Sequence, residues 1–182
     1  MLNISEIRLA FENTTFGVKK NDGIPASVLV TIYGSDVRIV MTKKSTKLRI
    51  HAGQISFPGG KPEKKDIDLI DTAIRESQEE LGLQVKREHI LTHLDDVKTL
   101  GTGYVITPYV CILNECRKLK ANDEVDHIYT PKLLELLKTR TEKTVHKIPD
   151  SVEFLIGDEI VWGASARILE QIRLLFKLNL HD

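Results

Sequence analysis

Two periodicities of hydrophobic and polar positions occur along this chain, and together they predict a mixture of helices and strands. A spacing near 3.6 residues predicts amphipathic helices at 3–12, 66–81 and 164–178. Between them, short runs rich in β-branched and aromatic residues predict strands. The predicted strands lie at 26–33, 37–42, 90–99, 104–113, 124–129, 152–156 and 160–161, with a shorter extended piece inside 48–57.

Turn and cap residues mark the ends of several of these elements. Asn3 followed by Glu6 is a capping-box pattern for the first helix. The segment 34–36 predicts a hairpin between the first two strands. Pro131 fits the first turn of another helix, over 131–137. Because Pro108 lies within a predicted strand, that strand is expected at a sheet edge or with a bulge.

Strands that alternate with helices indicate an α/β protein, with a mixed sheet and helices on its faces. The 182 residues suffice for one sizeable core, so we expect a single domain over 1–182. The segment 139–150 is polar and is predicted to be a loop.

Composition indicates an ordinary globular protein. Hydrophobic residues make up 41% of the chain and charged residues 29%. The net charge is zero, which predicts no nucleic-acid partner, and without a run of eighteen apolar residues we expect no membrane span. No secretory signal is visible, and Cys111 and Cys116 lack further Cys or His partners at the spacing of a metal site. We therefore expect the protein in a reducing cytoplasm, with Cys111 buried because it lies in an apolar run.

The predicted helix at 66–81 separates acidic from apolar residues. At about 100° per residue, Glu76, Glu79 and Glu80 share one face, with Arg75 at its edge. These carboxylates repel one another, and a hard cation such as Mg²⁺, which prefers oxygen ligands, relieves that repulsion. The alternative is a solvated charged face. The opposite face, which can pack on a core, carries Ile70, Ala73, Ile74, Ser77 and Leu81.

The acidic helix and the glycine turn before it form a motif at 59–83 that resembles the signature of the Nudix hydrolases. The match runs from Gly60 to Arg75-Glu76-x-x-Glu79-Glu80-x-Gly82-Leu83. The turn is one residue longer than the common form, and Asp66 stands where the family has Glu, which leaves the role of Asp66 open. The resemblance implies the Nudix fold, an α/β/α sandwich with a mixed β-sheet.

A second motif, at 40–60, is similar to the one that marks the Nudix subfamily acting on coenzyme A and its thioesters. It contains Thr42, a basic residue, a serine, Arg49 and the Phe-Pro-Gly-Gly run. Lys44 stands where the subfamily usually has Arg, which keeps the charge but loses the bidentate fork. Further similarity occurs at 103–110, 122–125 and 161–169, so the resemblance covers roughly 25–177.

The resemblance implies a metal-dependent hydrolase with a small-molecule substrate. The expected reaction cleaves the diphosphate linkage of coenzyme A or acyl-CoA and gives 3′,5′-ADP and (acyl-)4′-phosphopantetheine. Mg²⁺ or Mn²⁺ would neutralise the diphosphate and activate water. The alternatives are another nucleoside diphosphate substrate, such as ADP-ribose, NADH or a dinucleotide polyphosphate, and a non-catalytic nucleotide-binding module. A monomer or a homodimer is expected.

Residue by residue, the same resemblance gives a candidate site. The expected metal ligands are Glu76, Glu80, Glu79 and the carbonyl of Gly60. The expected general base is a helix glutamate, Glu79 or Glu76, or a later one, for which Glu124 is favoured over Glu153. Solvated lysines, a turn-capping His51 and a core Phe57 are the alternatives to substrate binding. The residues expected to bind substrate are Lys44, Arg49, His51, Phe57, Gly59 and Gly60.

Overall fold

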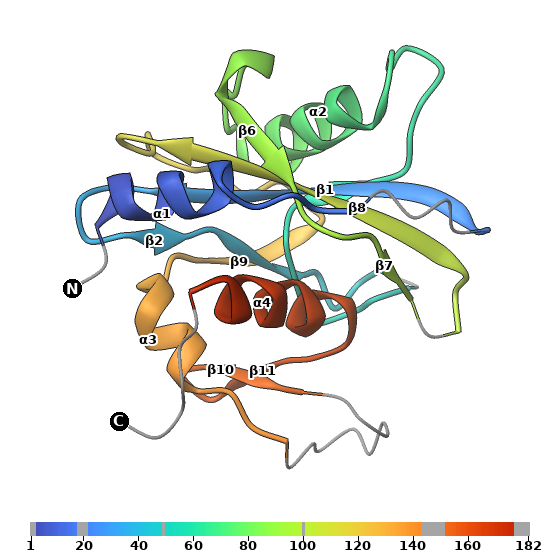
Figure 1. Cartoon of the computed structure of the whole chain (residues 1–182). Coiled ribbons are helices and arrows are strands. Elements are labelled where there is room, and N and C mark those ends of the chain that lie inside the picture. Colours follow the sequence, from blue (N-terminus) through green and yellow to red (C-terminus); the bar gives the residue numbers. More distant parts are fainter. Residues whose placement is uncertain (1–2, 18–21, 49, 100, 143–151, 177–182) are drawn as a thin grey trace.

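The structure, a computed structural model, describes residues 3–17, 22–48, 50–99, 101–142 and 152–176, which form four α-helices and three groups of strands (Figure 1). The helices are α1 (Ile4–Glu12), α2 (Leu69–Leu81), α3 (Leu133–Lys138) and α4 (Gly163–Leu175), with a 3₁₀ turn at Arg87–His89. The strands are β1 (Ile24–Tyr33), β2 (Arg38–Ile39), β3 (Met41–Lys44), β4 (Ile55–Ser56), β5 (Gly59–Gly60), β6 (Ile90–His93), β7 (Val97–Lys98), β8 (Tyr104–Leu113), β9 (Val125–Tyr129), β10 (Phe154–Ile156) and β11 (Glu159–Val161).

The main sheet is built around β1 and β8, which are ten residues long and pair in parallel along their whole length. β2 and β5 pair antiparallel with the other side of β1, while β6 and β7 pair antiparallel with the other side of β8. Parallel and antiparallel neighbours therefore share one sheet, which confirms the predicted mixed sheet.

Alternate residues of β1 face two different helical layers. Leu29 packs in a core cluster with Ala73 and Leu81 of α2, whereas Val30 packs in another cluster with Phe11 of α1 and residues of α4. This is the period-two alternation of a strand that is buried on both faces. Figure 1 shows α2 on one side of the central strands and α4 on the other, which confirms the α/β/α sandwich.

A smaller antiparallel sheet, in the order β4-β3-β9, carries the segment that leads to the glycine turn. The prediction of one strand over 37–42 was wrong, because this stretch divides at Val40 between β2 of the main sheet and β3 of the smaller one. The Val40 N–H still bonds to the Thr31 carbonyl of β1 (3.0 Å). The side chains still alternate between the two core clusters across this point, with Ile39 and Met41 in one cluster and Val40 in the other. The hydrophobic pattern of the sequence therefore does not show where one strand ends and the next begins.

The strand that contains Pro108 lies inside the main sheet, so the edge alternative was wrong. Its pairing with β6 does contain a register shift, which lies between Ile90 and Thr92 and not at Pro108. The partner strand predicted over 90–99 is instead two strands, β6 and β7, and the break between them lies opposite Pro108. The Pro108 carbonyl accepts from the Leu94 N–H (2.8 Å). Proline has no N–H to donate to a neighbouring strand, so the break accommodates it.

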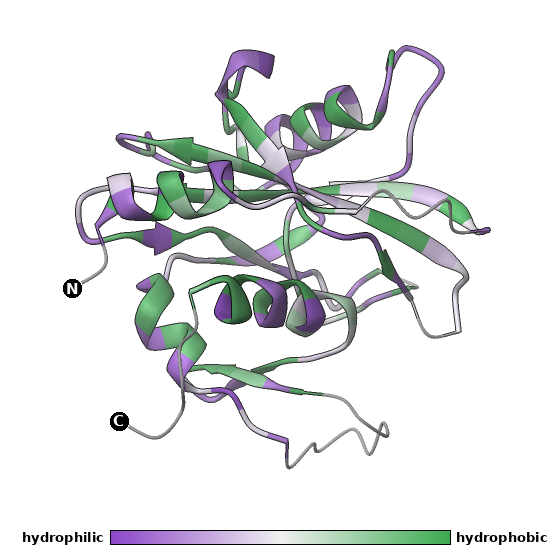
Figure 2. Cartoon of the chain, in the orientation of Figure 1, coloured by the Kyte–Doolittle hydropathy of each residue, from purple (hydrophilic) through white to green (hydrophobic). Residues whose placement is uncertain are grey.

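Helix α2 begins three residues later than predicted, at Leu69 instead of residue 66. Asp68 is its N-cap, and the Asp68 carboxylate accepts from the N–H groups of Ile70 and Asp71 (2.9 and 3.1 Å). The connection that precedes α2 is almost wholly hydrophilic (Figure 2). Asp66 therefore belongs to this connection and not to the helix.

Helix α3 also begins later than predicted, after Lys132, so Pro131 precedes it and is not in its first turn. The Pro131 carbonyl accepts instead from the Ile39 N–H (3.1 Å). At the N-terminal helix, α1, the predicted capping box of Asn3 and Glu6 is confirmed.

The remaining elements follow the sequence pattern in part. Within 48–57 only β4 is a strand, while β9, β10 and β11 begin within two residues of the predicted positions. Arg49 and the loop prediction from residue 143 on lie outside the described residues. The last helix, α4, ends at Leu175, before the predicted end at 178. No helix in the described ranges is long and apolar enough to cross a bilayer. Cys111 is buried, as predicted, and burial raises its pKa to about 12.

Candidate active site

Gly59 and Gly60, predicted as a turn, form the strand β5, which pairs with β1 and lies against the acidic side of α2. A Cβ on Gly59 would lie 2.2 Å from the Ser27 carbonyl oxygen of β1, and a Cβ on Gly60 would lie 2.4 Å from Glu76 Oε1. Both distances are shorter than side chains tolerate, so the two glycines allow the backbone to pass between β1 and the Glu76 carboxylate. The Glu80 carboxylate contacts the same strand, because it accepts from the Gly59 N–H (3.2 Å).

The Glu80 side chain is only 2% exposed, and its two oxygens differ. Oε1 accepts from Lys44 Nζ (2.8 Å) and from the Gly59 N–H. Oε2 is buried and accepts no hydrogen bond from the described residues. Burial raises the pKa of the Glu80 carboxyl, although the neighbouring Lys44 opposes this shift. A buried carboxylate oxygen without a donor is costly unless a cation or a proton occupies it.

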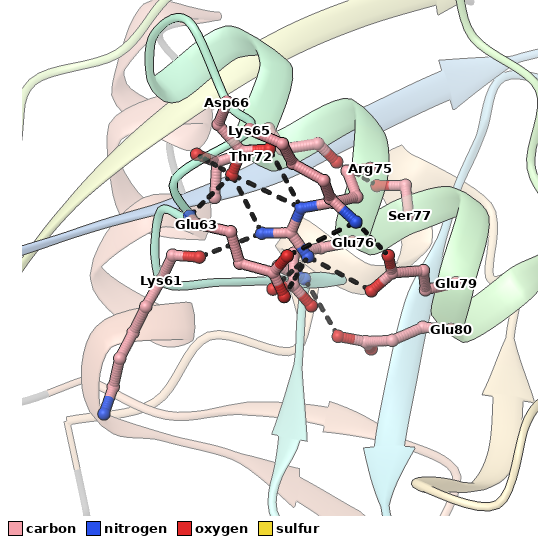
Figure 3. Close-up of polar contacts among 12 residues, drawn as sticks. Lys61, Glu63, Lys65, Asp66, Thr72, Arg75, Glu76, Ser77, Glu79 and Glu80 are labelled. Atoms are coloured by element: carbon pink, nitrogen blue, oxygen red, sulfur yellow. Dashed lines mark hydrogen bonds and ion pairs between the residues drawn. The ribbon is translucent and has the colours of Figure 1, made fainter.

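Arg75 lies at the centre of the acidic cluster (Figure 3). Its Nη1 donates to Glu76 Oε1 (2.9 Å) and to Glu79 Oε2 (3.1 Å). Its Nη2 donates to the Lys61 carbonyl (2.9 Å). Burial raises the pKa of Glu76, while the Arg75 guanidinium opposes the shift. Arg75 thus fixes the position of Glu76 between the helix and the glycine turn.

Asp66 holds Arg75 from the opposite side, which answers the question that the longer turn leaves open. Arg75 Nε and Nη2 each donate to the Asp66 carboxylate at 3.0 Å. The Thr72 hydroxyl (3.0 Å) and the Glu63 N–H (2.9 Å) also donate to it. The Arg75 guanidinium holds the pKa of this 3% exposed carboxyl well below its usual range.

Glu79 does not join the other two glutamates. Its side chain is 48% exposed and pairs with Arg75 and, at 3.5 Å, with Lys65. Among the described residues, no three acidic, histidine or cysteine side chains are gathered closely enough to hold a metal ion. The convergent donors are instead the Glu76 and Glu80 carboxylates, both next to β5.

This smaller donor set still fits a hard divalent cation. Glu80 offers an oxygen without a donor, Glu76 lies against Gly60, and the charge of Glu76 adds to the burial that raises the pKa of Glu80. Mg²⁺ typically takes one or two carboxylates and completes its shell with water and substrate phosphate. The residues present therefore suit such a group, with Glu79 as a ligand or base remaining a prediction.

A cavity of about 570 Å³ opens beside this acidic site. It brings together five of the six residues predicted to bind substrate, and Arg49, the sixth, is not described. The five residues are Lys44, His51, Phe57, Gly59 and Gly60. The opposite wall comes from the β8 and α4 segments. Its larger side chains are Tyr104, Ile106, Trp162, Arg167 and Ile168.

Two of the predicted substrate-binding residues, His51 and Phe57, make the contacts that their alternatives anticipated, whereas Lys44 is 14% exposed and is not a solvated lysine. Lys44 is paired with Glu80. His51 adopts a φ of 63°, which is unusual for a residue other than glycine, and its Nδ1 is hydrogen-bonded to Gln54 Oε1 (2.8 Å), so it closes a turn at the cavity wall. Phe57 is 1% exposed and belongs to the hydrophobic core. Substrate binding by these residues stays a prediction.

The two later base candidates do not line the cavity. Glu124 is exposed, but its loop is bound to the acidic helix through the Asn122 N–H, which donates to the Glu80 carbonyl (3.0 Å). Glu153 is buried, and its backbone pairs with Thr141 (2.9 and 3.0 Å). The identity of the base therefore stays a prediction. Of the two candidates, Glu124 belongs to the loop that is hydrogen-bonded to the acidic helix.

Sequence reasoning assigned no site role to Arg167 or Tyr104, yet both line the cavity. Arg167 is held by the Lys98 carbonyl, which accepts from its Nη2 (2.6 Å). Lys61 Nζ lies 4.9 Å from the centre of the Tyr104 ring, a cation–π distance. The signal was present in the similarity of 103–110 and 161–169 to the subfamily, but that similarity gave no side chain a role.

Comparisons with known proteins show which sequences this chain resembles. The model of the NUDIX domain family matches residues 23–154. The mitochondrial coenzyme A diphosphatase NUDT8 of Mus musculus is 33% identical over 157 residues, which cover 80% of this chain and 74% of that protein. An uncharacterized Nudix hydrolase, NudL, of Photorhabdus laumondii is 32% identical over 143 residues, or 74% of each chain.

Solved structures show the same fold at low sequence identity. A MutT/nudix family protein from Enterococcus faecalis has a TM-score of 0.63 at 13% identity, covering 100% of this chain and 72% of that one. The NUDIX domain of Shewanella oneidensis NrtR, crystallised with ADP ribose, has a TM-score of 0.56 at 16% identity, covering 86% and 90%. At such identities these likenesses concern the fold alone.

Proposed function

This chain belongs to the NUDIX domain family and is a pyrophosphohydrolase, and from that premise we propose that it hydrolyses the diphosphate linkage of coenzyme A or acyl-CoA. The observation that carries the proposal is the cavity beside Gly59 and Gly60. Most of the residues that line it come from the segments 40–60, 103–110 and 161–169, whose sequences resemble the coenzyme A subfamily. The relative NUDT8, by its name a coenzyme A diphosphatase, supports the same substrate.

The cavity has polar backbone and apolar side chains in its wall. Gly59 and Gly60, which contact Glu80 and Glu76 of α2, line it together with Ile106, Trp162 and Ile168. A cavity of about 570 Å³ is in the usual range for a small-molecule site. It would hold one arm of the substrate while the diphosphate lies against Gly59 and Gly60.

Hydrolases of this family generally use divalent metal ions. Here Glu76, Glu80 and the Gly60 carbonyl would hold the cation, proposed to be Mg²⁺ or Mn²⁺, which neutralises phosphate charge and lowers the pKa of water. Arg75 holds Glu76 and Glu79 in place. Glu79 or Glu124 accepts a proton from water, the water oxygen bonds to a phosphorus, and the bridging P–O bond breaks, which releases 3′,5′-ADP and (acyl-)4′-phosphopantetheine.

Product analysis tests this proposal. The protein is incubated separately with coenzyme A, acetyl-CoA, ADP-ribose and NADH, each with Mg²⁺ or Mn²⁺, and the products are identified by mass spectrometry. We expect both halves of coenzyme A to appear, with a kcat/KM roughly tenfold or more above those for ADP-ribose and NADH, which corresponds to about 1.4 kcal/mol of transition-state binding. Faster turnover of ADP-ribose or NADH would contradict the substrate assignment.

Two variants separate enzymatic turnover from contamination and from simple binding. Glu76→Gln keeps the shape of the side chain but removes the charge, so turnover should fall by orders of magnitude while the fold, measured by circular dichroism, is retained. Glu135→Gln changes an exposed glutamate of α3 and serves as the matched control, with unchanged turnover. Equal turnover by both variants would favour a non-catalytic role for this chain.

A further inference from the structure

We propose that Lys44 is a positioning residue for the metal ligand Glu80: it holds one carboxylate oxygen of Glu80 so that the other is presented to the cation. This differs from the expectation that Lys44 binds a substrate phosphate. The inference rests on the proposed role of Glu80 in the hydrolase, and it does not depend on which diphosphate is the substrate.

The backbone of Lys44 is fixed on both sides, so its side chain starts from a defined point. Its N–H donates to the Gln54 carbonyl (2.9 Å), and its own carbonyl accepts from the Gly53 N–H (3.0 Å). The register between β3 and β9 shifts between Lys43 and Lys44, which places Lys44 opposite Val125. From this position the side chain, 14% exposed, connects the smaller sheet to the acidic helix.

The contacts of Glu80 make its two oxygens unequal. Two donors, Lys44 Nζ at 2.8 Å and the Gly59 N–H at 3.2 Å, converge on Oε1. Oε2 is buried and accepts nothing from the described residues. With Oε1 held from two directions, rotation of the carboxylate is restricted, and one oxygen remains for a cation. Partners that orient a ligating carboxylate in this way are an ordinary feature of metal sites.

The charge of Lys44 also makes the buried carboxylate tolerable. A carboxylate that is only 2% exposed carries a large desolvation cost unless a cation accompanies it. Lys44 supplies that positive charge in the absence of a metal ion, and it stays hydrogen-bonded to Glu80 Oε1 when a metal ion binds at Oε2. Removal of the ammonium group would leave Glu80 held by a single backbone N–H.

Lys43 provides a matched control on the same strand. It points to a different partner, Glu159, in an ion pair whose side chains are 26% and 37% exposed. Glu159 belongs to the β10–β11 hairpin and contributes nothing to the acidic site or to the cavity wall. The substitutions Lys44→Met and Lys43→Met therefore remove the same charge from adjacent positions, and only the first disturbs Glu80.

The test measures Mn²⁺ binding without substrate, by calorimetry or by the electron paramagnetic resonance signal of free Mn²⁺. We expect Lys44→Met to weaken binding about tenfold or more, Lys44→Arg to restore it to within about threefold because it keeps charge and donors, and Lys43→Met to match the unmodified protein. With coenzyme A, Lys44→Met should need more metal for half-maximal rate, while KM at saturating metal changes little.

Three results would overturn the inference. The first is that Lys44→Met binds Mn²⁺ as tightly as the unmodified protein, or more tightly, while KM for coenzyme A rises, which would assign Lys44 to the substrate. The second is that the unmodified protein binds no Mn²⁺. The third is that Lys44→Arg fails to restore binding although its circular dichroism shows an intact fold.

The outcome separates this inference from the proposed function. If Mn²⁺ binding depends on Lys44 but coenzyme A is not cleaved, the substrate assignment fails and the role of Lys44 stands. Should Lys44→Met not fold, Lys44→Gln, which keeps a hydrogen-bond donor without the charge, is measured in the same assay and is also expected to bind Mn²⁺ more weakly.

Discussion

Two buried carboxylates lie at opposite ends of the segment 66–80, and they differ in how their oxygens are satisfied. Asp66, in the turn before α2, is 3% exposed and accepts hydrogen bonds on both oxygens, from Arg75, Thr72 and the Glu63 N–H. Glu80, in the last turns of α2, is 2% exposed and accepts on Oε1 alone. The pKa of Asp66 is lowered by Arg75, whereas burial raises that of Glu80.

The comparison shows two uses of the same chemical group. A carboxylate whose oxygens are all occupied stabilises the fold and has nothing left to offer a ligand. A carboxylate with one buried oxygen that accepts no hydrogen bond destabilises the folded state, and the binding of a cation or a proton at that oxygen removes this cost. Glu76, which accepts one bond from Arg75 and is 18% exposed, stands between the two.

Substitution of Glu80 should produce the largest effect on activity and little effect on stability. The amide oxygen of Glu80→Gln can still accept from Lys44 and Gly59, but an NH₂ group, which cannot ligate a cation, then stands where Glu80 has Oε2. We expect kcat/KM to fall roughly a thousandfold, about 4 kcal/mol of transition-state stabilisation. The free energy of unfolding should change by less than about 1 kcal/mol, because burial raises the pKa of Glu80 and so already disfavours its charged form, unlike that of Asp66. Steady-state kinetics and urea denaturation measure the two quantities.

A result in which Glu80→Gln unfolds the protein but keeps the activity per folded molecule would reverse the comparison. Glu135→Gln, exposed on α3, is the control for both measurements.

Substitution of Asp66 should show the opposite pattern. Asp66→Asn removes the charge that Arg75 faces, and breaking a buried ion pair from one side costs on the order of 3 kcal/mol of unfolding free energy. We expect the loss of kcat, measured where the variant is folded, to stay within about tenfold, because Arg75 still contacts Glu76 and Glu79.

The control for Asp66 is Asp71→Asn. Asp71 is 29% exposed and pairs with Arg87, so its substitution should cost no more than about 1 kcal/mol. If Asp66→Asn and Asp71→Asn lower the free energy of unfolding equally, the Asp66–Arg75 pair does not contribute more to stability than an exposed ion pair.

The pH dependence of stability should show the smallest of these effects. The folded-state pKa of Asp66 lies below its unfolded value of about 3.9, so its contribution is complete above that pH and is lost as the pH falls further. We expect the unmodified protein to lose stability more steeply than Asp66→Asn below about pH 4. Urea midpoints measured from neutral to acidic pH test this, and parallel curves would contradict it.

Several features followed from the residues without any tertiary information. The helical period placed Ala73, Ser77 and Leu81 on the buried side of α2, and all three are buried. The capping box of α1 and the mixed sheet were also predicted correctly, because each depends on local geometry or on a period of two or 3.6 residues. Gly59 and Gly60 were predicted as a turn and instead form the strand β5, which pairs with β1.

Other features depended on contacts that no local pattern contains. Helix α2 starts where Asp68 provides the N-cap. Strand β8 can lie inside the sheet because its neighbour is interrupted, between β6 and β7, opposite Pro108. Three glutamates of α2 were expected to bind the metal ion, but Glu79 is 48% exposed and pairs with Arg75 and Lys65, and its role stays a prediction. Arg167 entered the cavity wall through the packing of α4.

The sequence by itself determined that Glu76 and Glu80 lie one turn apart on the same side of a helix, because backbone geometry fixes that spacing. Only the tertiary structure decided what each carboxylate meets. Lys44 lies 36 residues before Glu80 and contacts it from the smaller sheet. Asp66 contacts Arg75 from the connection before the helix. Such pairings depend on how layers pack, and that packing sets which oxygen is satisfied and which remains for a ligand.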